Sequence, residues 1–168
     1  MNNTILKKRV DISTWSTILT IVTIAALIGM CILEFYKNEN VVICCLPLVF
    51  LAIWSFFNLF YCPMYLRLTD KSLNVETSIR TKSFALSEIE EVKICPPTMS
   101  EKRICGSGGF FGYWGWFSEP SIGKYFAYYG MASQTFLIRL RSGRQYMLGC
   151  RDAAEMAKEL EKLLQRNE

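Results

Sequence analysis

Histidine is absent from the 168 residues of this chain, and its absence excludes whole classes of chemistry. Histidine is the commonest general base and the commonest metal ligand in proteins. Serine and cysteine triads of the ordinary kind, which need an imidazole, are therefore excluded. Carboxylates cluster in residues 88–91 and 155–161, but their turn and helix positions are typical of solvated surface charge. We predict no catalytic residue, and hence no enzyme.

Cysteine motifs with metal or disulfide spacing are also lacking. The chain has seven cysteines, an odd number, and no two of them have CxxC spacing. Those in or beside apolar runs are Cys31, Cys44, Cys45 and Cys62. Such placement is unlike the disulfide framework of a small secreted protein. We therefore expect reduced thiols in a reducing compartment, with no bound metal and no cofactor.

Signals for nucleotide or nucleic-acid binding are missing as well. The glycine-rich stretch at residues 106–109 is followed by Phe110 and Phe111, where a P-loop needs lysine and then serine or threonine. Residues 63–168 carry 15 Lys and Arg against 12 Asp and Glu, and the basic residues are not clustered. So small a surplus predicts no nucleic-acid partner.

Charged residues are absent from two long apolar runs, Ile12 to Leu33 and Val41 to Tyr61. A bilayer core of about 30 Å needs about 20 consecutive apolar residues in a helix. Neither run has the polar stripe of a helix on a soluble core. A signal peptide is excluded because the first run is too long and no small-residue cleavage site follows it. We predict transmembrane helices at residues 12–33 and 41–61.

Basic residues are concentrated before the first run and after the second, and not in the loop that connects them. They are Lys7, Lys8 and Arg9 before the first run, and Arg67, Lys71 and Arg80 after the second. The connecting loop, residues 34–40, holds one lysine and two glutamates. The positive-inside rule then places residues 1–11 in the cytoplasm, loop 34–40 outside and a domain at residues 64–168 in the cytoplasm. The expected location is the inner (cytoplasmic) membrane, multi-pass, with both termini cytoplasmic.

The part of the chain after Pro63 has the pattern of a mainly-β domain. Seven segments alternate in polarity or lie between turn signals: 64–69, 72–77, 81–86, 91–95, 124–129, 135–141 and 144–149. A capping box of Asp152 and Glu155 begins a helix whose apolar stripe is Met156, Leu160, Leu163 and Leu164. One helix cannot cover both faces of a parallel sheet, so we predict a partly open barrel of about seven antiparallel strands capped by the C-terminal helix.

Several short segments resemble the bacterial pleckstrin-homology-like (PH-like) domain families. They are Tyr65-Leu-Arg-Leu-Thr-Asp70, Leu86-Ser-Glu-Ile-Glu-Glu-Val92, Gly106-Ser-Gly-Gly-Phe-Phe-Gly-Tyr113 and Arg141-Ser-Gly-Arg-Gln-Tyr146. The resemblance covers about residues 64–165 and implies a seven-stranded barrel capped by the helix, with no particular activity. Lipid-binding PH domains hold inositol phosphates with several basic residues near the first inter-strand turn. Here that turn, Thr69-Asp-Lys71, is short and half acidic, which argues against specific phosphoinositide recognition.

The segment Gly106 to Phe117 holds five glycines and six aromatic residues. It could be a hairpin that packs its rings on the domain core, or an apolar patch facing the bilayer or another protein chain. Three basic residues near it could meet anionic headgroups. The candidate interaction surface consists of Phe110, Phe111, Tyr113, Trp114, Trp116, Phe117, Lys102, Arg103 and Lys124.

These patterns together predict a membrane-anchored PH-like binding or scaffolding module at the cytoplasmic membrane face. Its partners would be the bilayer and a protein partner or a second copy of the chain. The alternative is an accessory subunit of a transport or signalling complex, whose transmembrane helices pack against partner helices.

Overall fold

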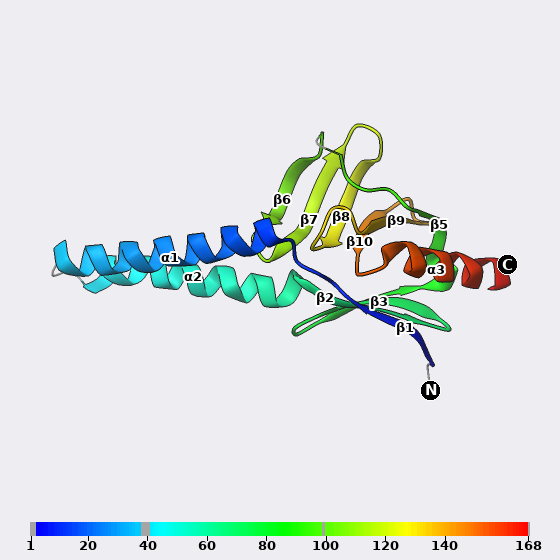
Figure 1. Ribbon diagram of the computed structural model, residues 1–168, viewed down its shortest axis with the longest axis horizontal. Helices are drawn as coiled ribbons and strands as arrows, with labels where there is room; N and C mark the ends of the chain where they lie inside the picture. The colour runs from blue at the N-terminus through cyan, green and yellow to red at the C-terminus, as the bar shows by residue number, and fades with distance from the viewer. Residues whose placement is uncertain (1–2, 38–40, 99, 168) are drawn as a thin grey trace.

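The computed structural model describes residues 3–37, 41–98 and 100–167. Its elements in chain order are β1 (Thr4–Arg9), α1 (Thr14–Lys37), α2 (Val41–Tyr61), β2 (Pro63–Thr69), β3 (Ser72–Thr77), β4 (Thr81–Ala85), a 3-10 turn η1 (Leu86–Glu88), β5 (Ile89–Lys93), β6 (Lys102–Gly109), β7 (Gly112–Glu119), β8 (Gly123–Tyr129), β9 (Thr135–Leu140), β10 (Gln145–Gly149) and α3 (Ala153–Asn167). A pair of long helices projects from one side of a mainly-β domain (Figure 1).

The two apolar runs form the projecting helices. By length and composition α1 is able to cross a bilayer, and only 6% of its most apolar stretch is buried. A helix of a soluble core would be mostly covered. In α2 the shorter stretch Cys45–Asn58 is apolar. Helix α1 continues through residues 34–37 of the predicted outer loop, and residues 38–40 of that loop lie outside the described residues.

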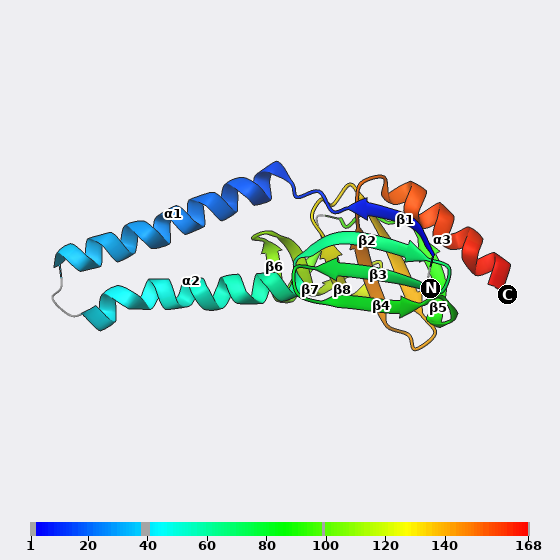
Figure 2. The same cartoon turned by 90° about the horizontal axis from the view of Figure 1, so that it is seen from below.

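The domain consists of two sheets. One has the strand order β1-β2-β3-β4, and the other has the order β5-β9-β10-β8-β7-β6. The larger core cluster joins residues of both sheets to α3, so the domain is a sandwich closed at one end by the helix (Figure 2). The predicted C-terminal helix is confirmed, with Met156 and Leu160 fully buried and Leu163 partly buried.

The predicted barrel of seven antiparallel strands needs correction. Ten strands are present in the described residues, in two sheets without a closed barrel, and β8 pairs with β10 in parallel. The additional strands are β1, β6 and β7. Residues 4–9 were interpreted only as a basic flank of the first apolar run, while glycines broke the alternation expected of β6 and β7.

A second, smaller core lies on the face of the six-stranded sheet away from β1–β4. It contains Phe117, Tyr125, Ala127, Tyr129, Leu137 and Met147. The segment between β5 and β6 contributes to it, because Cys95 packs on this cluster and Glu101 accepts hydrogen bonds from two of its tyrosines. Both faces of the central strands β9 and β10 are therefore covered.

Candidate functional site

The glycine-rich and aromatic segment forms a hairpin, β6–β7, which we call the aromatic ribbon (residues 102–119). Gly106 and Gly115 lie opposite each other, both with positive φ, and a Cβ on either would lie within 2.2 Å of a backbone oxygen of the other strand. The strands thus approach more closely here than residues with side chains allow. At the tip the Ser107 hydroxyl donates to the Phe110 carbonyl oxygen at 2.8 Å.

The tip of the aromatic ribbon contacts the domain-proximal ends of α1 and α2. The Phe111 N–H donates to the Thr20 hydroxyl oxygen of α1 at 3.1 Å. The Phe110 ring meets the Trp54 ring of α2 edge-on, with centroids 5.9 Å apart. The Cys62 thiol, just after α2, donates to the Phe111 carbonyl oxygen at 2.9 Å. These contacts join both helices to the domain.

Trp114 makes the most buried polar contact between the aromatic ribbon and α2. Its indole N–H donates to the Asn58 side-chain oxygen at 3.0 Å, and both residues are buried. Its ring stacks on Tyr61 at 5.1 Å. Asn58 is a polar residue within the second apolar run, and Trp114 supplies the partner that its burial requires.

We expect Asn58→Ala to destabilise the junction by about 1–3 kcal/mol, because it leaves the Trp114 N–H buried without an acceptor. Trp114→Phe removes the donor, so the double variant should cost less than the sum of the single changes. Thermal unfolding of the full chain in detergent micelles measures this difference. Strict additivity would contradict a direct coupling of the two residues.

The predicted interaction residues do not share one environment. Phe110, Trp114 and Phe117 are buried, and Phe111 and Tyr113 are half-buried. The remaining members are exposed: Trp116, Lys102, Arg103 and Lys124. The structure therefore brings the first group against α1, α2 or the smaller core and leaves the second group at the surface.

Apolar grooves lie where the aromatic ribbon meets the helices, and one of about 410 Å³ is lined by Asn58, Cys62 and Phe111 among others. Two more lie between the helices and the strands of the ribbon. One of about 390 Å³ lies between α2 and the ribbon and is lined by Trp54, Phe57, Tyr61, Trp114, Trp116 and Phe126 among others. The other, of about 280 Å³, lies between α1, α2 and β6, with Arg103 at its wall. Neither brings together acidic, thiol or amine groups. Among the described residues, no cluster of three Cys, Asp or Glu is able to hold a metal ion.

Glu101 is a half-buried residue whose role the sequence did not indicate. Its carboxylate accepts hydrogen bonds from the hydroxyls of Tyr125 at 2.7 Å and Tyr129 at 2.9 Å. Burial, with this carboxylate nearby, raises the pKa of both tyrosines far above the ordinary value. Both tyrosines therefore remain protonated donors at physiological pH. Their hydrogen bonds to Glu101 fix the β5–β6 connection, which is a structural role.

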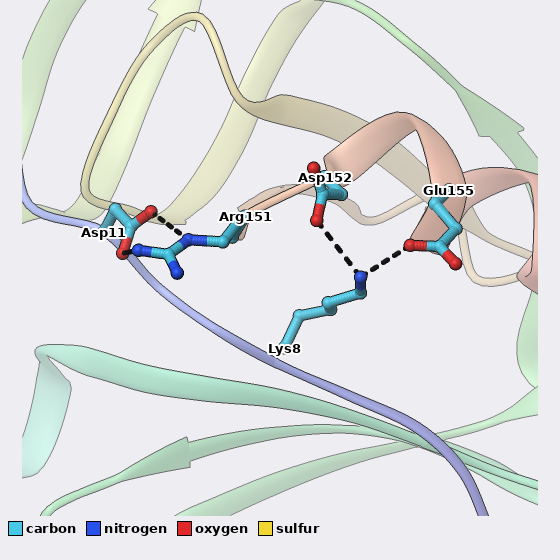
Figure 3. A network of polar contacts seen from close by, with 5 residues as sticks. All are labelled: Lys8, Asp11, Arg151, Asp152 and Glu155. Atoms are coloured by element: carbon cyan, nitrogen blue, oxygen red, sulfur yellow. Dashed lines mark hydrogen bonds and ion pairs between the residues drawn. The ribbon is translucent and has the colours of Figure 1, made fainter.

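The N-terminal strand is fixed to the domain by backbone pairing and by ion pairs (Figure 3). The Lys8 ammonium lies 3.1 Å from Asp152 and 2.5 Å from Glu155, and Arg151 forms a two-bond contact with Asp11. The predicted capping box is therefore wrong in its detail. Asp152 has a positive φ of 55°, and both carboxylates bind Lys8 in place of the helix backbone.

Hydrogen bonds from Lys8 to Glu155 and Asp152 raise the pKa of the Lys8 ammonium. Because folding raises this pKa, the ion pairs of Lys8 stabilise the folded state at pH values below the ordinary lysine pKa. This stabilisation is lost as the pH rises above that value. At physiological pH, β1 therefore remains joined to the start of α3.

Comparison with known proteins identifies the domain. Residues 64–164, more than half of the chain, match the family model described as bacterial PH domain. No curated protein matches the chain, and no solved structure matches it. The matched range begins at β2 and ends within α3, so it contains both sheets except β1. The chain belongs to the bacterial PH domain family.

Proposed function

We propose that this chain is a membrane-anchored PH-like module that binds or scaffolds a partner at the cytoplasmic membrane face. In this proposal α1 and α2 cross the inner membrane as a hairpin. The family match and the exposed apolar surface of α1 support it. On the two helices, exposed apolar side chains include Ile21, Val22, Ile32, Val49, Ile53 and Phe56, a surface suited to lipid.

The observation that carries the proposal is a strand pair formed across the helical hairpin. Strand β1 precedes α1, and β2 follows α2, yet the two are antiparallel neighbours with Lys7 opposite Arg67. Both of these residues also form ion pairs with Glu76 of β3, at 2.8 and 2.6 Å. If only one helix crossed the bilayer, β1 and β2 would lie on opposite sides and could not pair. The pairing therefore supports two crossings, or none.

The basic residues beside the helices support a cytoplasmic orientation. Lys7, Lys8 and Arg9 form the end of β1, shortly before α1 begins at Thr14. Cytoplasmic loops carry an excess of lysine and arginine. The pairing of β1 with the domain supports a cytoplasmic location for the domain and the C-terminus as well.

Reporter fusions to the full chain test this topology. An enzyme active only outside the cytoplasm should be active when inserted at residue 38 and inactive when fused after Glu168. A cytoplasm-specific reporter should give the reverse pattern. Activity of the C-terminal fusion outside the cytoplasm would contradict the proposal, and so would release of the chain from membranes by alkaline carbonate.

Affinity purification from membranes tests the binding role. The full chain should retain a partner, another protein or a second copy, that is lost when residues 64–168 are deleted. A partner retained by the helices alone would favour the alternative, an accessory subunit of a transport or signalling complex.

A further inference from the structure

Strand β6 is an edge of the six-stranded sheet, and it lies on the side toward which the helices project. Figures 1 and 2 both place β6 nearest the helical hairpin, with β7, β8 and the remaining strands progressively farther away. In Figure 1 the strand runs across the direction of α1. If the helices span the membrane, as proposed above, this edge lies along the bilayer surface.

The exposed residues of this edge combine positive charge with apolar surface. Lys102, Arg103, Ile104 and Cys105 are all exposed at the start of β6, and Ile104 is 53% exposed. Trp116 of β7 lies opposite Cys105 and is 41% exposed beside the larger apolar groove. Tryptophan at headgroup depth and basic side chains near anionic lipid are both favourable.

The turn between β3 and β4 offers the same combination on the other sheet. Figure 2 places this turn near the domain end of α2. Ile79 is 55% exposed and is followed by Arg80, while the Ser78 hydroxyl contacts the Met64 sulfur just after α2. By contrast, the Thr69-Asp-Lys71 turn lies at the end of this sheet away from the helices (Figure 2).

The charges on this side of the domain lack acidic partners. Among the described residues, no ion pair includes Arg80, Lys102 or Arg103, whereas Lys7, Lys8 and Arg67 are all paired with carboxylates. The opposite edge of the six-stranded sheet, β5, carries Glu90 and Glu91 followed by one lysine. Arg80, Lys102 and Arg103, which form no ion pair with any described residue, therefore lie on the side of the helices.

We propose that Ile79, Arg80, Lys102, Arg103, Ile104 and Trp116 form a membrane-facing rim that binds anionic phospholipid headgroups. The inference rests on the proposed membrane anchoring and adds a second lipid contact to it. The basic groups bind headgroup phosphates, and Ile104 and Trp116 enter the headgroup layer. Because the aromatic ribbon joins β6 rigidly to both helices, lipid at the rim fixes the orientation of the whole domain.

Hydrogen–deuterium exchange of the full chain in lipid nanodiscs tests the rim. One sample contains phosphatidylcholine, and the other an equal mixture of phosphatidylcholine and phosphatidylglycerol. In the anionic lipid, amide exchange at residues 102–105 should slow about fivefold, the factor that corresponds to ~1 kcal/mol for one basic residue near such a surface. Lys102→Ser combined with Arg103→Ser should abolish the difference between the two lipids.

A matched control removes the same charge elsewhere. Lys158→Ser with Arg166→Ser changes two exposed cations on α3, whose C-terminal end lies opposite the helices (Figure 1), and should leave the lipid effect at β6 intact. Unchanged exchange in β9 shows that both variants are folded. The rim would be overturned if the unchanged chain exchanged equally in the two lipids, or if both double variants lost the lipid effect to the same extent. In either case, a chain that still resisted extraction by carbonate would leave the membrane anchor supported. Release by carbonate would overturn the anchor itself.

Discussion

Leu160→Asp is expected to abolish the cooperative unfolding transition of the PH-like domain. Leu160 lies on α3, is fully buried, and belongs to the core cluster that joins both sheets. Removing a buried leucine side chain costs about 2–5 kcal/mol, and burying an unpaired carboxylate adds several more. The total is comparable to the whole stability of a domain this size, about 5–15 kcal/mol. Limited proteolysis and thermal denaturation of the full chain measure the loss.

Lys158→Asp is the control for this change. It introduces the same residue on the same helix, but Lys158 is exposed. We expect its melting temperature to stay close to that of the unchanged chain, because surface substitutions usually alter stability little. Equal melting of both variants would mean that α3 does not contribute to the core.

The parts of the fold that the sequence predicted well are those with regular polarity. Leu66 and Val75 alternate with polar residues in their segments, and both are buried in the larger core. The spacing of Met156 and Leu160 likewise identified the buried stripe of α3. In each case the side-chain period reports directly which face of an element is covered.

The contacts of the candidate site could not be predicted in this way, because they depend on partners distant in the chain. The bonds Thr20–Phe111 and Asn58–Trp114 each join a residue of an apolar run to the aromatic ribbon. No periodicity relates the two segments. Composition left open whether these rings pack on the core or form an exposed apolar patch, and tertiary packing divides them between the helices, the smaller core and the exterior.

Strand β1 was missed for a different reason. Its basic residues carry a strong topological signal, and only Leu6 and Val10 beside them pack on the core. The sequence thus predicted that residues 7–9 stay on the cytoplasmic side of a membrane. It did not show that Lys7 and Lys8 also pair with Glu76 and with the start of α3.

Gly115→Ala is expected to disrupt the aromatic ribbon and separate the domain from its helices. A Cβ at residue 115 would lie 2.2 Å from the Cys105 carbonyl oxygen and 2.7 Å from the Gly106 Cα, and both atoms belong to the facing backbone. No rotamer change relieves such a clash, so the strands must move apart. Trp114 immediately precedes Gly115, and its hydrogen bond to Asn58 should be lost with the displacement.

Gly143→Ala separates this steric effect from backbone strain. Gly143 also has a positive φ, of 79°, but a Cβ there meets no atom within 4 Å. Its replacement should cost only about 1–2 kcal/mol, the ordinary penalty of an L-residue in this conformation. Gly115→Ala should cost more and should also shift the Trp fluorescence, because Trp114 leaves its buried contact with Tyr61. If both changes lowered the melting temperature equally without a fluorescence shift, the close approach of β6 and β7 would not be what positions the domain on the helices.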